Sequence, residues 1–224
     1  MPPAAVRPAR ALAPRPAKAP LANSPTQQSL KSSQTRARLI EATIRCIVKH
    51  GYSSTTTPQV AAEAGLSRGA MLHHFENGAA LIKAAIVELH EKRLRAFRRA
   101  ADLDHNDVGA LVGVYWRQIS KPTFIAFHEL ALASRSNADL ARILKPLQQE
   151  FRERFNAQAV ILFPEWQGHE ERFRLAMALS QTTLEGMAIN RLTGAFDEEM
   201  VGPMLAYLES QIRKLNPLTV GGEV

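Results

Sequence analysis

Residues 55–81 read TTTPQVAAEAGLSRGAMLHHFENGAAL, and this stretch decides the fold. Thr56 and Gln59 have the Thr-x-x-Gln spacing of a capping box, which satisfies free amides at the start of a helix. Gly65 ends that helix, because glycine adopts the left-handed backbone conformation at little cost. Ser67 can then cap a second short helix. Two short helices joined by a tight turn are typical of a helix-turn-helix, whose second helix enters the DNA major groove.

Positive charge is concentrated in the first half of the chain. Residues 1–34 carry +5, residues 35–101 carry +6 and residues 102–224 carry −4, which gives the net charge of +7. The first two segments therefore suit a polyanion such as DNA. Because each phosphate contact releases counterions, we expect binding that depends steeply on salt.

Composition also excludes several classes of protein. No apolar run is long enough to span a membrane, and the N-terminus lacks the apolar core of a signal peptide. The one cysteine, Cys46, cannot form an internal disulfide, and its neighbours Ile44 and Ile47 predict a buried, inert thiol in a cytoplasmic protein. No glycine-rich phosphate loop or glycine-flanked serine is present, so we expect neither an enzyme nor a cofactor.

The first segment, residues 1–34, holds seven of the thirteen prolines and is predicted to be a disordered basic tail. It is either a solvated tail or an arm that adds non-specific DNA affinity. The basic residues of such an arm would be Arg7, Arg10, Arg15 and Lys18.

The remainder of the chain is predicted to be all-α. Beyond the helix-turn-helix, we expect helices near residues 34–50, 77–101, 108–120, 122–134, 138–162, 169–192 and 197–215. Pro146 predicts a kink or break in the fifth of these. This pattern divides the chain into a DNA-binding domain (35–82), a linking helix (77–101), a ligand-binding and dimerisation domain (102–216) and a flexible C-terminus (217–224).

The sequence resembles the TetR family (TetR/AcrR-type) of bacterial transcription regulators. The resemblance rests on Gly51-Tyr52, Thr56, Val60-Ala61, Ala64-Gly65-Leu66-Ser67, Arg68-Gly69 and His73-His74-Phe75, followed by Leu81. It implies an all-helical homodimer with an N-terminal three-helix DNA-binding domain. It also implies a C-terminal domain that binds a small organic effector and dimerises through its last two long helices. Such a protein is cytoplasmic, and nucleoid-associated when it is bound to DNA.

The resemblance also assigns roles to residues of the helix-turn-helix. Thr56 and Thr57 would anchor a phosphate, and Arg68 would reach a guanine edge or a phosphate. Ala70 and Met71 would meet a thymine methyl group. The full predicted DNA-binding set is Thr56, Thr57, Gln59, Ser67, Arg68, Gly69, Ala70, Met71, His73 and His74.

Two residues depart from the family pattern. Leu72 stands where many relatives have a phosphate-contacting tyrosine, and Gly78 stands where a lysine is common. We therefore expect a lower intrinsic DNA affinity than in a typical member. His73 and His74 point about 100° apart on a helix and have no further ligand at a suitable spacing, so no metal site is expected.

The C-terminal half contains polar side chains among apolar ones, as in pockets that orient small ligands. The predicted ligand-binding residues are Trp116, Phe124, Phe127, His128, Met177, Gln181 and Glu185. The alternative is that the aromatic residues form ordinary core and the polar residues face solvent.

The last two helices are predicted to form the dimer interface. Small residues suit close packing on the first of them, and a larger apolar stripe runs along the second. The predicted interface comprises Ala178, Thr182, Gly186, Ile189, Leu205, Leu208 and Ile212. The alternative is that the stripe covers its own domain.

These features favour a transcriptional repressor that binds a palindromic double-stranded operator and leaves it when a small molecule binds. In a dimer, two recognition helices about 34 Å apart would enter successive major grooves. One alternative is a DNA-binding protein without an effector, either of broad specificity or architectural. Another is a structural helical adaptor whose DNA motif is vestigial.

Overall fold

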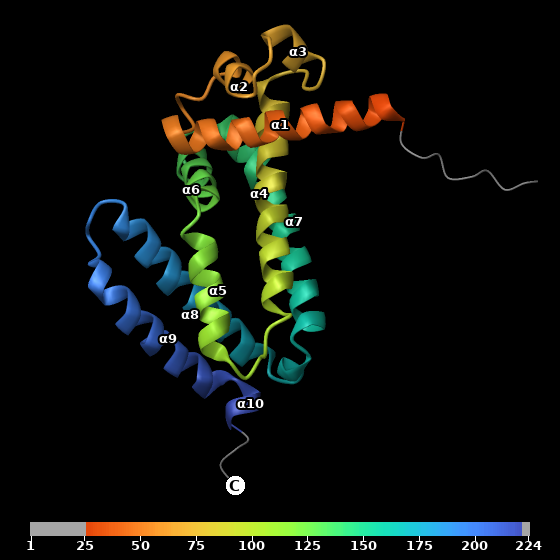
Figure 1. Cartoon of the computed structure of the whole chain (residues 1–224). Helices are drawn as coiled ribbons and strands as arrows, with labels where there is room; N and C mark the ends of the chain where they lie inside the picture. Colours follow the sequence, from red (N-terminus) through yellow and green to blue (C-terminus); the bar gives the residue numbers. More distant parts are fainter. Residues whose placement is uncertain (1–25, 221–224) are drawn as a thin grey trace, which may run out of the picture.

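The computed structural model of the chain describes residues 26–220, and this part is all-α (Figure 1). The first four helices are α1 (Gln27–His50), α2 (Thr57–Glu63), α3 (Arg68–Leu72) and α4 (Gly78–Ala100). The next three are α5 (Val108–Ile119), α6 (Pro122–Ser134) and α7 (Ala138–Leu162). The last three are α8 (Glu170–Arg191), α9 (Val201–Leu215) and α10 (Pro217–Val220), with short 3-10 turns η1 (Pro164–Trp166) and η2 (Glu198–Met200). The predicted fold class is confirmed.

The described helices differ from the predicted ones at three places. Helix α1 begins at Gln27 rather than near Gln34, because Thr26 caps it by accepting a hydrogen bond from the Ser29 amide. Helix α7 continues through Pro146, so of the predicted kink or break the break does not occur. The segment Pro217–Val220 is helical rather than irregular. The basic residues of the predicted N-terminal arm lie outside the described residues.

Helices α1, α2 and α3 and the first turns of α4 enclose one core, which we call the helix-turn-helix core. Its buried residues are Leu39, Ala42, Cys46, Val60, Ala61, Ala64, Met71, Phe75 and Leu81. Burying each large apolar side chain stabilises this small unit by about 1.5–3 kcal/mol. Cys46 is buried as predicted, and burial raises the pKa of its thiol, as expected for an inert cysteine.

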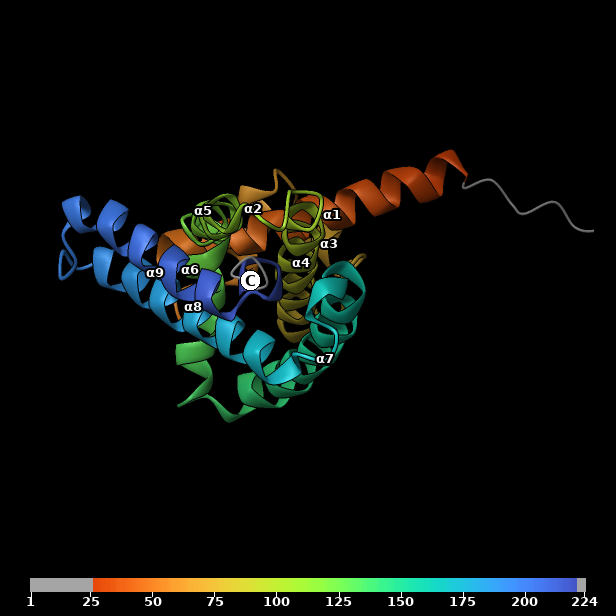
Figure 2. The ribbon, with the colours of Figure 1, turned by 90° about the horizontal axis from the view of Figure 1, so that it is seen from below.

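Helix α4 leaves the helix-turn-helix and runs alongside α7 toward the other end of the molecule (Figure 1). A second core ties α1 to α4, α6 and α7, through residues such as Ile44, Ile86, Leu130 and Leu140. Helices α8 and α9 lie side by side and both pack on α5 (Figure 2). None of the described helices is long and apolar enough to cross a bilayer.

Candidate DNA interface and ligand cavity

The turn between α2 and α3 has the hydrogen bonds that its sequence predicts. The Thr56 amide donates to Gln59 Oε1 at 2.9 Å. Gly65 has φ 65°, and the amide of Leu66 donates to the carbonyl of Ala61 at 2.8 Å, which closes α2. Ser67 Oγ accepts from the Ala70 amide at 3.1 Å and starts α3. Local sequence signals therefore fix the direction in which α3 leaves α2.

Helix α3 presents one face to solvent and buries the other. Ser67, Arg68, Gly69 and His73 are exposed, whereas Met71 is 0% exposed in the helix-turn-helix core. The predicted contact between Met71 and a thymine methyl group is therefore wrong, because this side chain points away from solvent. A Cβ atom on Gly69 would meet only Ser67 Oγ, at 3.9 Å. Packing within the described chain thus does not require glycine here, and its small size leaves room for close approach to DNA.

The other predicted DNA-binding residues differ in exposure. Thr56 and Gln59 are exposed, and Thr57, Ala70 and His74 are partly buried. The two departures from the family pattern are accessible or close to this set. Leu72 is 47% exposed, and a Cβ atom on Gly78 would lie 3.2 Å from Thr57 Cγ2.

Arg36 is a residue of the DNA-binding unit whose role the sequence did not reveal. Its Nη1 donates to the carbonyl of His74 at 2.7 Å, and its guanidinium lies 4.0 Å from the centre of the Phe75 ring. Arg36 therefore fixes the turn after α3 from the neighbouring α1. Its distance from these residues in sequence gave no signal of the contact.

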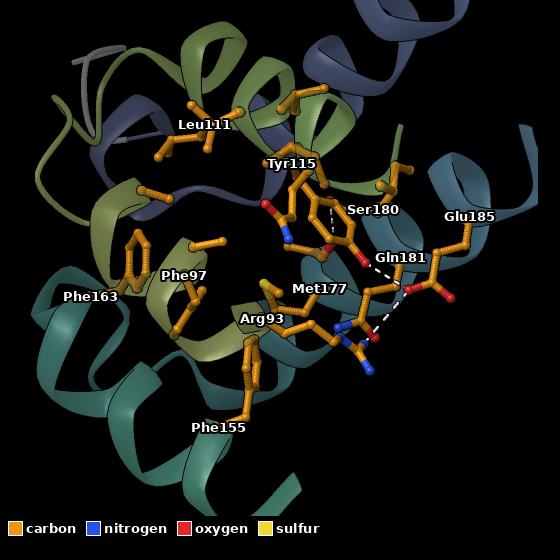
Figure 3. Close-up of a pocket in the computed structure, with 18 of the residues that line it drawn as sticks. Arg93, Phe97, Leu111, Tyr115, Phe155, Phe163, Met177, Ser180, Gln181 and Glu185 are labelled. Carbon is orange, nitrogen blue, oxygen red and sulfur yellow. Dashed lines mark hydrogen bonds and ion pairs between the residues drawn. The ribbon is translucent and has the colours of Figure 1, made fainter. Parts of the chain in front are cut away.

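A cavity of about 170 Å³ lies between α4, α5, α6, α7 and α8 (Figure 3). Six of the seven predicted ligand-binding residues line it, namely Phe124, Phe127, His128, Met177, Gln181 and Glu185. Trp116 does not line the cavity, and its prediction is corrected. Its ring instead packs 5.3 Å from the guanidinium of Arg191, because it points about 100° away from its neighbour Tyr115, which does face the cavity.

Glu185 is the centre of a polar group at one end of the cavity (Figure 3). The hydroxyl of Tyr115 donates to its Oε1 at 2.8 Å, and His128 Nε2 lies 3.6 Å from its Oε2. Arg93 Nη2 lies 3.8 Å from Oε1. Burial acts to raise the pKa of Glu185, but the contacts with His128, Tyr115 and Arg93 outweigh it and lower the pKa. Burial, followed by the charge of Glu185, raises the pKa of Tyr115, so its hydroxyl stays a donor.

Arg93 and Tyr115 are cavity residues that the sequence analysis missed. Arg93 lies in a helix segment rich in basic residues, from Lys92 to Arg99, which favours a solvent-exposed side chain. Its position was nevertheless informative, since it lies one turn after Leu89 and one turn before Phe97, within the apolar stripe. The wall is also rich in aromatic side chains, namely Phe97, Phe151, Phe155, Phe163, Phe173 and Trp166, and contains Leu111.

The outer faces of α8 and α9 carry exposed apolar groups. Leu175 is 56% exposed and Tyr207 is 63% exposed. Of the predicted interface residues, Ala178 and Thr182 are exposed, Gly186 and Ile189 are partly buried, and Leu205 packs against its own core. Leu208 and Ile212 are only 2% and 8% exposed, so their assignment to a dimer interface is wrong. They cover their own domain because α9 packs on α5.

Within residues 26–220, no three side chains of histidine, cysteine, aspartate or glutamate come together to hold a metal ion. In particular, His73 is exposed at the end of α3, and His74 is partly buried beside Phe75.

Comparisons of the sequence and of the fold with known proteins both find bacterial transcription regulators. Residues 39–85 match the family model of "Bacterial regulatory proteins, tetR family". An uncharacterized HTH-type transcriptional regulator of Mycobacterium tuberculosis is 28% identical over 188 residues, which cover 82% of this chain and 96% of that protein. The HTH-type transcriptional regulator BetI of Burkholderia thailandensis is 32% identical over 130 residues, which cover 52% of this chain and 67% of BetI. The crystal structure of multidrug binding protein EbrR complexed with imidazole has a TM-score of 0.56 at 22% identity, covering 81% of this chain and 94% of EbrR.

Proposed function

Because this chain belongs to the TetR family of DNA-binding transcriptional regulators, we propose that it is a homodimeric repressor released from its operator by a small organic ligand. Members of this family bind DNA through the helix-turn-helix and are not enzymes. What we propose for this chain is repression, release by a ligand and the position of the dimer interface.

The observation that carries the proposal is the course of α4. Its first turns supply Leu81 to the helix-turn-helix core, and its second half supplies Arg93 and Phe97 to the cavity wall. A ligand that favours a different position of α4 would therefore also move the support of α3. Such a ligand acts only through its unequal affinity for the two positions, and about 3 kcal/mol would change DNA affinity more than a hundredfold.

The exposed face of α3 supports a direct role in DNA binding. Arg68 stands at the start of the helix, where its guanidinium can reach a guanine edge or a phosphate. Thr57 at the start of α2 can bind a neighbouring phosphate through its hydroxyl and amide groups, whereas the amide and hydroxyl of Thr56 both donate to Gln59.

Dimerisation is proposed through the outer faces of α8 and α9. The surface consists of Leu175, Ala178, Thr182 and Gly186 on α8 and Tyr207 on α9. A Cβ atom on Gly186 would meet nothing within 4 Å, which leaves space for a partner helix. Two copies joined in this way would read the two halves of a palindrome.

The experiment is a selection of bound sequences from random double-stranded DNA, followed by affinity measurements at about physiological salt. We expect a palindromic site that binds at least about 1000-fold more tightly than unrelated DNA. A ratio near one would instead favour a non-specific or architectural DNA-binding protein.

A further inference from the structure

Two buried polar atoms in the cavity residues have no hydrogen-bond partner, although one of them lies within ion-pair distance of a histidine. They are Arg93 Nη1 and Glu165 Oε1, and no other buried side-chain nitrogen or oxygen in the described part of the chain shares this property. Buried polar groups are nearly always hydrogen-bonded, so an orphaned guanidinium nitrogen in a cavity wall indicates that a bound molecule supplies its partner.

At the Arg93 end, what is missing is an acceptor. Glu185 already accepts from the Tyr115 hydroxyl and lies within 3.6–3.8 Å of nitrogens of His128 and Arg93. His128 Nδ1 in turn donates to the carbonyl of Phe124 at 3.0 Å, since a carbonyl can only accept. The Glu185 carboxylate thus faces three side chains, yet Arg93 Nη1 is left without an acceptor. An acceptor on a bound molecule would complete the hydrogen bonding of Arg93.

The acidic group at the other end already faces a basic partner. Glu165 Oε1 lies 3.0 Å from His105 Nδ1, and the ring of His105 stacks on Phe163 at 4.5 Å. Figure 3 shows Phe163 across the cavity from Glu185. The wall between these ends contains apolar side chains such as Phe97 and Met177, together with the polar Ser180 and Gln181. The cavity therefore has an Arg93 nitrogen without an acceptor at one end, beside the ion pair with Glu185, and a body rich in aromatic side chains.

A cationic ligand fits this arrangement poorly. Aromatic faces attract cations, but the Arg93 guanidinium already lies 4.9 Å from the centre of the Phe127 ring and 4.5 Å from that of Phe151. A second cation at this end would meet the charge of Arg93, and the Glu185 carboxylate there already faces Arg93, His128 and Tyr115.

We propose that the effector is an aromatic carboxylic acid whose carboxylate accepts hydrogen bonds from Arg93 and whose ring fills the apolar part of the cavity. Guanidinium and carboxylate form strong, charge-assisted hydrogen bonds. A cavity of about 150 Å³ holds a benzene molecule in another protein, so about 170 Å³ suits one ring with a short side chain. This inference deepens the proposed function and rests on the same cavity.

The test uses the full chain without DNA and isothermal titration calorimetry. The probes are 3-phenylpropanoate, 4-phenylbutanoate and 2-naphthoate, each compared with the primary amide and the primary amine of the same skeleton. We expect at least one acid to bind about tenfold or more tightly than its amide and its amine. Amides or amines that bind as tightly as the acids would overturn the proposal, and so would the absence of binding by every acid.

Variants then assign the carboxylate to Arg93. Arg93→Gln is expected to weaken binding of the acid by about 10- to 100-fold and to remove its preference over the amide. Arg99→Gln changes an exposed arginine of the same helix and should leave both unchanged. An acid preference that survives Arg93→Gln would contradict the assignment. If the Arg93 variant does not fold, the preference of the unaltered chain for acids over amides and amines still decides the ligand class.

A parallel measurement of operator affinity separates this inference from the proposed function. If an acid binds through Arg93 but leaves operator affinity unchanged, the effector class is supported and ligand-controlled release from the operator is contradicted. If amides release the protein from the operator as well as the acids do, ligand-controlled release is supported and the assignment of the effector to carboxylic acids is contradicted.

Discussion

Leu81 and Arg93 lie on the same helix, yet Leu81 is 2% exposed in the helix-turn-helix core and Arg93 lines the ligand cavity. Their separation along α4 corresponds to about 18 Å. A helix is stiff over this length, so a displacement at Arg93 is carried to the residues that support α3. Under the proposed function, this relationship would link the cavity mechanically to the DNA-binding unit.

Arg68 is expected to supply affinity and sequence preference. Arg68→Ala should weaken operator binding by about 1–3 kcal/mol per recognition helix, because a contact to a guanine edge or phosphate is lost. Fluorescence anisotropy with the selected operator at several salt concentrations measures this loss. Arg99→Ala serves as the control, because it also removes one positive charge but lies at the end of α4 that is distant from α3. Equal affinity of the Arg68 variant and the unaltered chain would remove α3 from the interface.

Met71 is expected to act through stability rather than through DNA contact. Met71→Ala would leave a cavity in the helix-turn-helix core and lower the free energy of unfolding by about 2–5 kcal/mol. Met71→Leu conserves the apolar volume and should cost less than about 1.5 kcal/mol. Urea unfolding measures both values. Full operator affinity for the folded Met71→Leu variant is the expected companion result, and a selective loss of affinity would show that the side chain meets DNA.

Gly78 is expected to limit affinity for the DNA backbone. Gly78→Lys should strengthen operator binding and steepen its salt dependence by about one phosphate contact. The gain depends on a small shift of Thr57, because a Cβ atom at position 78 would lie 3.2 Å from Thr57 Cγ2. Gly78→Ala tests the steric effect without the charge. If Gly78→Lys left the operator affinity and its salt dependence unchanged, the absence of a lysine at position 78 would not limit DNA binding.

The outer faces of α8 and α9 are expected to hold the dimer together. Tyr207→Glu and Leu175→Glu would bury unpaired charges in the interface and shift the protein to monomers. Analytical ultracentrifugation measures the shift. Leu132→Glu is the matched control, because Leu132 is 67% exposed on α6, outside this surface. A dimer that persists in both interface variants would mean that the copies meet elsewhere.

His90 is expected to make the fold sensitive to acid. Burial, helped by the charge of Arg93, lowers its pKa from 6.5 to about 4. The unfolded chain therefore takes up a proton below pH 6.5 that the folded chain resists until about pH 4, so stability is present above pH 6.5 and is lost as the pH falls through this window. Between pH 7 and 5 the loss is about 2 kcal/mol.

The variant His90→Gln does not titrate and keeps a donor for Gln148, whose Oε1 lies 3.1 Å from His90 Nε2. Urea unfolding at pH 7 and pH 5 should show a smaller loss for this variant than for the unaltered chain. His73→Gln, which changes an exposed histidine, should not alter the loss. If all three proteins lost the same free energy of unfolding between pH 7 and pH 5, His90 would not be the source of the acid sensitivity.

The helix-turn-helix could be predicted from sequence because its signals are local. The capping residues Thr56 and Ser67 and the glycine at position 65 lie next to the turn that they specify. By contrast, the polar segment before residue 34 has no apolar periodicity, and this hid the first turns of α1.

The cavity and the dimer surface were predicted less completely because tertiary packing decides them. Arg93 lies in an apolar stripe, but only the packing of α4 on α5, α6 and α7 turns it into a cavity. Trp116 and Tyr115 are neighbours that face different ways. The stripe that contains Leu208 and Ile212 would suit either a partner or its own core, and contact with α5 selects the core.

The central claim is that occupation of the cavity controls DNA binding through α4. Its most direct test is the affinity of the full-length protein for its selected operator, measured by anisotropy with and without a saturating aromatic acid that calorimetry shows to bind. We predict that the acid lowers operator affinity about a hundredfold or more, and that it loses this effect in Arg93→Gln. An operator affinity that stays the same while the cavity is full would contradict the claim.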